Sequence, residues 1–276
     1  MMGTDTCKER EKVAEENASS GCNDKALMYF LAAAECWKRW ESFAKAANAF
    51  ERAYEHGMLC QKYAKASEAM LEAGMAWIKQ GQYEKFEIDC QIGAEAFILA
   101  AEEEKDPHRF VDGAFFSILG GDMELARQLI HAAVETTRGK DKELINLALM
   151  LSEYHYGEAD RYIEAAITRV LDRDQVKRIR KYFLLMFAGF VRTSLESEAA
   201  VTIASLAEST GMEKKRISKF IMQCVNEGLI PAFYDEVSEE LVVDQDRFDI
   251  EDITRRKGPI MSRDLDDPGA WDMELE

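Results

Sequence analysis

Four histidines, His56, His108, His131 and His155, are the side chains best suited to bind a metal or to transfer protons. They are far apart in the sequence, and none belongs to an HExxH motif or stands beside a cysteine at metal-ligand spacing. The chain also lacks a Walker phosphate loop and the GxSxG and GxGxxG motifs. We therefore expect no catalytic residue, no metal and no cofactor. An enzyme whose site is assembled only in space is the less favoured alternative.

Two groups of basic side chains have the chemistry to bind phosphates or acidic partners. One lies at the start of an amphipathic helix and consists of Lys214, Lys215, Arg216 and Lys219. The other lies in a stretch, 169–181, with six basic residues against two aspartates, and consists of Lys177, Arg178, Arg180 and Lys181. For both groups, a solvated helix face is the plainer alternative to a binding site.

The chain as a whole is acidic. It has 52 Asp and Glu against 35 Lys and Arg in 276 residues, a net charge of −17 and a pI near 4.8. That balance argues against broad binding to nucleic acid or anionic membranes, although it permits a local basic patch. The longest apolar stretch, around 183–191, is about half of what a bilayer crossing needs. We expect a cytoplasmic protein without a membrane span.

Six cysteines are scattered along the chain without a CxxC pair: Cys7, Cys22, Cys36, Cys60, Cys90 and Cys224. A secreted disulfide framework is unusual in a helical chain of this size. We expect reduced thiols that pack as small apolar side chains.

The histidines, basic groups and cysteines named above must be positioned by the fold, and the sequence shows a repeat of helical hairpins. Only 4 prolines and 16 glycines interrupt the chain, which favours long helices. Four segments share an Ala/aromatic helix, a break and a second Ala-rich helix, with breaks near Trp40, Gly81, Gly121 and Gly157. One hairpin buries only one face by itself, so neighbouring hairpins must stack. An irregular helical bundle is the alternative.

The first hairpin resembles the long-helix, tetratricopeptide-like hairpins of soluble NSF attachment proteins (SNAPs) in its segments AECW (34–37) and FAKAA (43–47). The resemblance covers roughly residues 22–170 and implies a binding scaffold without chemistry of its own. The strict tetratricopeptide signature, with a proline near the end of each repeat, is absent, since only Pro107 lies in this region.

Residues 199–243 change in character. A short helix at 201–207 is followed by a turn at Gly211 and by a second helix with an apolar stripe at 217, 220, 221, 224 and 225. Gly228 ends that helix, and two strands follow, at 229–234 and 241–243, around a turn at 235–240. This order predicts a helix-turn-helix with a wing.

The run GLIPAFYD (228–235), with LVV at 241–243, is similar to the last part of PCI domains, which occur in the proteasome lid, the signalosome and a translation initiation factor. Those domains also follow stacked hairpins, and the likeness covers about residues 140–245. It implies that winged helices of different subunits pair at their sheet edges, here through Leu241, Val242 and Val243. Two departures weaken it: Pro231 interrupts the first wing strand, and 178–190 has no diagnostic pattern.

The alternative from another class is a winged-helix DNA-binding transcription regulator with a helical sensor domain. Its recognition helix would place the basic group at 214–219 in a major groove. Residues 199–243 nevertheless carry seven acidic against four basic side chains, and the acidic wing would repel the phosphate backbone.

The tail from Asp244 onward has eleven acidic and five basic residues and two of the four prolines, a composition typical of disorder. Its last residues mix acids with Trp271, Met273 and Leu275. This mixture is typical of a short motif that inserts into a basic, apolar groove, and equally of an unstructured end.

These observations predict a mainly α fold: a flexible segment at 1–21, a stacked-hairpin α-solenoid at 22–195, a small winged-helix (α+β) domain at 196–245 and a disordered acidic tail at 246–276. We expect a non-catalytic scaffold or adaptor, as a subunit of a PCI-type assembly or as a SNAP-like trafficking adaptor. Its expected partners are helical-repeat or winged-helix subunits or proteins with basic surfaces.

Overall fold

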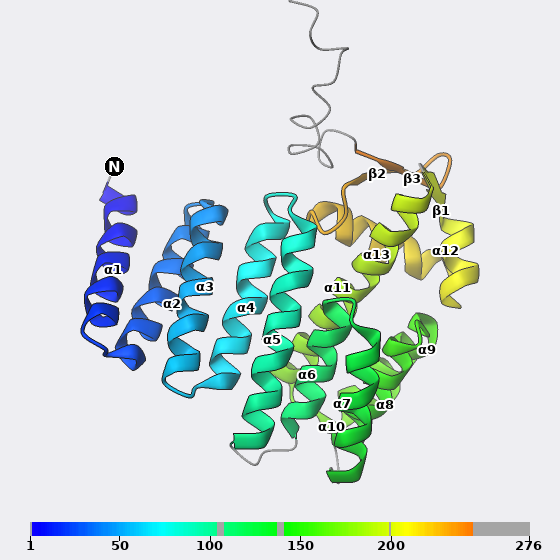
Figure 1. Cartoon of the computed structure of the whole chain (residues 1–276). Coiled ribbons are helices and arrows are strands. Elements are labelled where there is room, and N and C mark those ends of the chain that lie inside the picture. The colour runs from blue at the N-terminus through cyan, green and yellow to red at the C-terminus, as the bar shows by residue number, and fades with distance from the viewer. Residues whose placement is uncertain (1, 104–107, 137–140, 199, 245–276) are drawn as a thin grey trace, which may run out of the picture.

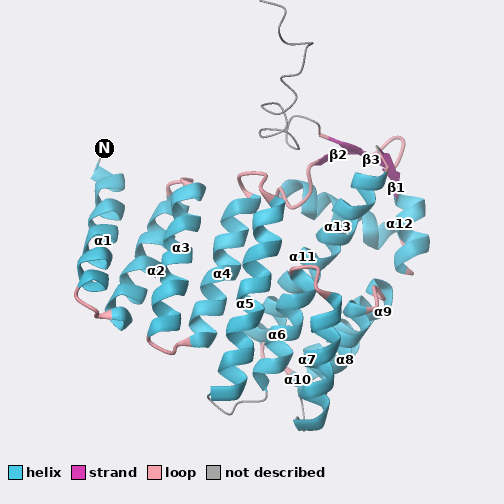
Figure 2. Cartoon of the chain, in the orientation of Figure 1, coloured by secondary structure: helices cyan, strands magenta, loops and turns pink. Residues whose placement is uncertain are grey.

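The computed structural model describes residues 2–103, 108–136, 141–198 and 200–244. Over these ranges the chain is mainly α-helical, with stacked helices and one small three-stranded antiparallel sheet (Figure 2). The predicted mainly α fold class is confirmed at this level.

The first part of the chain is a row of helices in which each packs against the next. Figure 1 shows α1 to α5 side by side, with α1 at one end of the row. The elements are α1 (Met2–Ser19), α2 (Asn23–Arg39), α3 (Phe43–Leu59), α4 (Tyr63–Ile78), α5 (Tyr83–Glu103), α6 (His108–Leu119) and α7 (Met123–Thr136).

Tight turns join α1 to α5 at a spacing of 20 residues, half of the period that the sequence indicated, and a turn of the same kind joins α6 to α7. The residues at positive φ in the turns are Gly21, Glu41, Gln61, Gly81 and Gly121. In each turn the next backbone N–H donates to a carbonyl five residues earlier, as Ser42 does to Trp37 at 3.0 Å, which is the Schellman pattern of helix ends. The predicted breaks near Trp40, Gly81 and Gly121 are confirmed, and those at Gly21 and Gln61 were missed.

The predicted break at Gly157 is wrong. The helix α8 (Asp141–Ser152) ends in a turn around Tyr154, whose φ is 62°, and α9 (Tyr156–Tyr162) has already begun at Gly157. His155 donates its backbone N–H to the Met150 carbonyl at 2.9 Å, so this turn has the same bond pattern without a glycine.

A single long helix joins the row to the rest of the chain. After α9, a π-helical turn η1 (Ile163–Ile167) and the short α10 (Thr168–Val170) lead to α11 (Arg173–Ser197). Asp172 starts α11 with a capping box, since its side chain accepts from the Gln175 N–H and the Gln175 side chain accepts in return. One face of α11, including Phe183, Phe187 and Val191, is buried.

The sheet belongs to a small unit of two helices and three strands, residues 200–243, named here the α/β unit. It contains β1 (Ala200–Thr202), α12 (Ile203–Thr210), α13 (Lys214–Asn226), β2 (Ala232–Asp235) and β3 (Glu240–Val243), in the strand order β1-β3-β2. The first helix starts two residues later than predicted, because 200–202 pair with β3 and the Thr202 hydroxyl caps the Ser205 N–H. The strand predicted at 229–234 begins only after Pro231, which has no N–H to donate.

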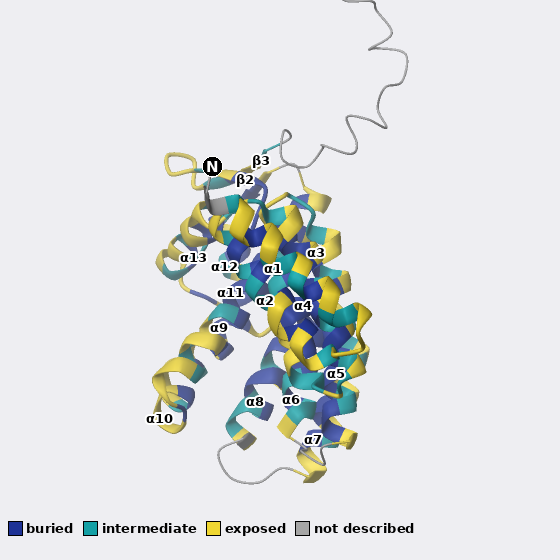
Figure 3. Ribbon diagram, turned by 90° about the vertical axis from the view of Figure 1, so that its left-hand side faces the viewer, coloured by how far each residue is buried: buried dark blue, intermediate teal, exposed yellow. Residues whose placement is uncertain are grey.

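Two clusters of buried apolar side chains form the interior. One joins α1 to α4, and the other runs without interruption from α4 through α11 into the α/β unit. Figure 3 shows buried residues along the faces where helices meet, and exposed ones on α10 and on the turn between β2 and β3.

The prediction of a flexible segment at 1–21 is also corrected. Residues 2–19 form α1, and its Cys7 and Ala14 are fully buried against α2. The sequence hid this helix because α1 is predominantly polar and has few apolar residues to form a periodic stripe.

Candidate functional site

A groove of about 560 Å³ lies where α9, η1, α11 and α13 meet, and it is named here the α11 groove. The apolar side chains that line it are Ile163, Phe183, Leu184 and Phe220. Its charged residues come from all four elements and are Asp160, Glu164, Asp174, Lys177, Arg178, Arg180, Lys181, Arg216 and Glu227. The groove therefore combines apolar contact area with a charged rim.

The fold brings the two predicted basic groups together at this groove. Arg216 of the group at 214–219 lines it together with all four residues of the group at 177–181. Arg216 donates to both carboxylate oxygens of Asp160, at 2.9 and 2.7 Å, and its guanidinium lies 4.8 Å from the centre of the Phe220 ring. The hydrogen bond to Asp160 raises the pKa of Arg216 further above its ordinary value. Arg216 thus joins α13 to α9.

Two further basic residues of the rim also have partners. Arg180 donates to both oxygens of Glu164 at 3.0 Å, and Lys181 reaches across to Glu72 of α4 at 3.1 Å. Burial opposes ionisation of Glu72, but its ion pairs with Lys181 and Lys38 outweigh this, so its pKa is lowered. These contacts connect α11 to η1 and to α4.

Lys177 and Arg178 differ from the other rim cations. Both are exposed, and within the described ranges neither makes an ion pair. Their charges remain available to a ligand on a protein that carries a net charge of −17. They are the two residues on which the binding chemistry of the α11 groove depends most directly.

The wall formed by α13 is held against the helical row by a second set of contacts. Arg192 of α11, 4% exposed, donates to the Leu229 carbonyl and to Glu87 of α5, both at 3.1 Å. Tyr83 of α5 donates to the Gly228 carbonyl at 3.2 Å, and Lys79 donates to the Glu227 carbonyl. The groove is thus built on elements that are fixed to one another.

The remaining basic residues of the group at 214–219 do not line the groove. Lys214, Lys215 and Lys219 are exposed on α13. The opposite side of this helix is buried against α11, where Phe220 lies 5.3 Å from the Phe183 ring centre. A DNA-reading helix would therefore present three lysines rather than the four cations of the prediction.

The predicted edge strand is wrong. Leu241, Val242 and Val243 lie in β3, the central strand of the sheet, with β1 on one side and β2 on the other. Its neighbours already use its backbone groups, so it cannot pair with another chain. The sequence showed two wing strands but not β1, because three residues after a long helix carry no strand pattern of their own.

The predicted tail motif of Trp271, Met273 and Leu275 lies outside the described residues.

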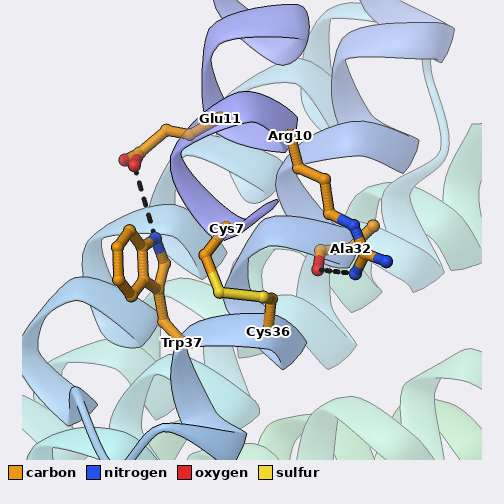
Figure 4. The surroundings of a disulfide bond; sticks show 6 residues. All are labelled: Cys7, Arg10, Glu11, Ala32, Cys36 and Trp37. Atoms are coloured by element: carbon orange, nitrogen blue, oxygen red, sulfur yellow. Dashed lines mark hydrogen bonds between the residues drawn. A yellow bond between two sulfur atoms is a disulfide. The ribbon is translucent and has the colours of Figure 1, made fainter. Parts of the chain in front are cut away.

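The expectation of reduced thiols is wrong for one pair. Cys7 of α1 and Cys36 of α2 form a disulfide, with their Cα atoms 5.4 Å apart. Figure 4 shows it between two contacts of the same helices: the Trp37 indole N–H donates to Glu11 at 3.3 Å, and Arg10 donates to the Ala32 carbonyl at 3.1 Å. The other four cysteines are free thiols. The cytoplasmic location stays a prediction.

Sequence reasoning missed the acidic partners and the apolar lining of the groove. Asp160 and Glu164 carried no motif, and Phe220 was recognised only as part of an amphipathic stripe. The sequence did contain one indication of the groove. In each of two helices, at 177–184 and 214–220, a phenylalanine follows a run of basic residues.

A search of the described ranges finds no group of three or more His, Cys, Asp or Glu side chains able to hold a metal ion. Over the same residues no helix has both the length and the apolarity required to cross a bilayer. No protein-family model matches the chain, and no curated protein matches its sequence significantly.

Proposed function

We propose that this protein is a non-catalytic interaction scaffold that captures protein partners in the α11 groove. The observation that carries the proposal is a pair of exposed cations, Lys177 and Arg178, which have no ion-pair partner among the described residues and line the groove together with the partly exposed Phe220. A ligand segment with acidic and bulky apolar side chains would satisfy both features at once.

The architecture supports a scaffold role in a second way. Ion pairs and hydrogen bonds from α4 and α5 to α11 and to the 227–229 segment fix the walls of the groove before any partner arrives. A preformed site avoids the entropic cost of ordering its walls on binding.

The finer identity that we propose is a winged-helix-bearing subunit of a PCI-type assembly, and the second form is a SNAP-like trafficking adaptor. The order of the elements, stacked hairpins followed by two helices and a small antiparallel sheet, supports the first form. The edge strands available to a neighbouring subunit would be β1 and β2 instead of β3.

The test is capture of partners by the tagged full-length chain, compared between two charge-matched double variants. Lys177→Glu with Arg178→Glu changes the groove, and Lys214→Glu with Lys215→Glu changes exposed lysines outside it. Native mass spectrometry should detect a complex of fixed stoichiometry that the groove variant loses and the control retains. A bare monomer or homodimer, or equal capture by both variants, would contradict the proposal.

The same variants decide the DNA alternative. A scaffold should show no saturable binding to duplex DNA at near-physiological salt. Salt-sensitive duplex binding that disappears in the Lys214→Glu, Lys215→Glu variant would establish the regulator in its place.

A further inference from the structure

The α11 groove and the tail of the same chain have complementary chemistry. The groove offers apolar side chains under a rim on which Lys177 and Arg178 have no acidic partner within the described residues. The tail, defined as residues 244–276, has eleven acidic against five basic side chains. The tail therefore carries an excess of negative charge, opposite in sign to Lys177 and Arg178, on the same molecule.

The alternation of residues at 271–276 matches the groove more specifically. Trp271, Met273 and Leu275 alternate with Asp272, Glu274 and Glu276. A period of two places the apolar side chains on one face of an extended peptide and the carboxylates on the other. Such a segment can direct its apolar face to Phe220, which is partly exposed, while its acids stay within reach of the cationic rim.

The tail also starts close to the groove. The Asp244 N–H donates to the Pro231 carbonyl at 2.9 Å, and Pro231 is four residues from Glu227, which lines the groove. Four residues span at most about 14 Å. There are 27 residues from Asp244 to Ala270, and a flexible linker of that length has a root-mean-square reach of about 30 Å. The length of the linker therefore permits binding within one molecule.

We infer that the segment Trp271–Glu276 binds in the α11 groove of its own chain and competes there with partner proteins. This inference rests on the proposed function of the groove. Linkage through a short chain gives the segment a millimolar effective concentration, on the order of 1 mM, so a weak contact suffices to occupy the site. A partner must displace the tail, which makes the tail a built-in competitor.

The experiment places a photo-cross-linker in the full-length chain, as Trp271→p-benzoylphenylalanine. Irradiation should give cross-links within one chain, located by mass spectrometry in residues 173–184 of α11 or 214–226 of α13. The variants Lys177→Glu and Arg178→Glu together should lower the yield about tenfold, because two favourable charge contacts become repulsive. The control, Lys214→Glu with Lys215→Glu, makes the same change of net charge and should leave the yield unchanged.

Circular dichroism of each variant checks that helix content is retained, and the milder pair Lys177→Gln and Arg178→Gln repeats the test without charge reversal. Cross-links at other surfaces, cross-links only between two chains, or a yield indifferent to both groove variants would each overturn the inference.

A partner-capture assay separates this inference from the proposed function. Replacing Trp271, Met273 and Leu275 by serine should increase partner capture if the tail competes. If the cross-links fail but capture still depends on Lys177 and Arg178, the groove binds partners and the tail does not regulate it. If capture is also indifferent to the groove variants, the proposed function itself is wrong.

Discussion

At the scale of single residues, Gly157 has a different structural role from the one that the sequence predicted. It was assigned to a turn, but it lies in α9 against the turn between α12 and α13. A Cβ at position 157 would lie 2.3 Å from the Gly211 carbonyl oxygen, closer than any real contact. The glycine is required because two backbone segments approach each other there.

The variant Gly157→Ala should therefore lower the free energy of unfolding by about 1–3 kcal/mol, since the backbone must move to accept the methyl group. Gly189→Ala is the matched control, because the nearest atom to its added Cβ is Arg192 Nη2 at 3.7 Å. That variant should be neutral or stabilising by up to about 1 kcal/mol, as expected for alanine in a helix. Urea denaturation measures both. Equal stability of the two variants would refute the close approach.

Asp89 gives a prediction about pH. It is 5% exposed, and burial raises its pKa to about 7, with the charge of Glu51 adding to the effect and Lys85 opposing it. The folded state therefore keeps a proton that the unfolded chain releases from about pH 4 upward. The free energy of unfolding consequently falls as pH rises from about 4 to 7.

Between pH 5 and pH 8 the carboxyl of Asp89 should cost the protein about 2–3 kcal/mol of stability. Asp89→Asn removes the titrating group, so its urea midpoint should rise relative to the wild type as pH increases across this interval. A difference between the two proteins that does not change with pH would show that Asp89 ionises normally.

At the scale of elements, α1 depends on a covalent link. Few of its side chains are apolar, and its contacts with α2 include the Cys7–Cys36 disulfide, the hydrogen bonds of Arg10 and Trp37, and a buried face around Cys7 and Ala14. A disulfide between residues 29 apart stabilises by about 3–4 kcal/mol on the chain-entropy estimate.

Cys7→Ser should accordingly accelerate amide hydrogen exchange throughout 2–19, while α5 to α7 keep their protection. Hydrogen exchange with mass spectrometry measures this. Cys22→Ser is the control, because Cys22 is an exposed free thiol in the turn between α1 and α2. Unchanged protection of α1 in Cys7→Ser would mean that noncovalent packing alone holds the helix.

At the scale of the whole molecule, the important observation is the course of the hydrophobic core. The buried cluster that begins in α4 includes Phe116, Phe187, Ile217 and Leu241, so the α/β unit shares its interior with the helical row. A module that buries its apolar residues only together with its neighbour should not unfold separately from it.

Two buried cysteines report on this cooperativity. Cys90 in α5 and Cys224 in α13 are both fully buried, and burial raises the pKa of each thiol above its usual range. In a chain with Cys22→Ser and Cys60→Ser, both thiols should become reactive at the same urea concentration. Pulsed alkylation with mass spectrometry measures this. Labelling of Cys224 at a clearly lower concentration would identify the α/β unit as an independent domain.

The sequence by itself determined the local structure: the predominance of helices, most of the turns, and the apolar stripe of α13. Helix periodicity and the positive-φ preference of Gly81, Gly121 and Gly228 act over a few residues, so they can be recognised without knowing the chain path. Turns formed by Gln61 and Tyr154 escaped notice because packing imposes a positive φ there on residues that do not prefer it.

Which of these local features contact one another is determined only by the tertiary structure. The central position of β3, the pairing of Cys7 with Cys36 and the joining of two basic groups at the α11 groove all bring together residues far apart in sequence. Arg216 and Asp160, 56 positions apart, illustrate the reason. Neither belongs to a motif, and their contact exists because α11 carries α13 back against α9, a path that follows from the packing of the whole core.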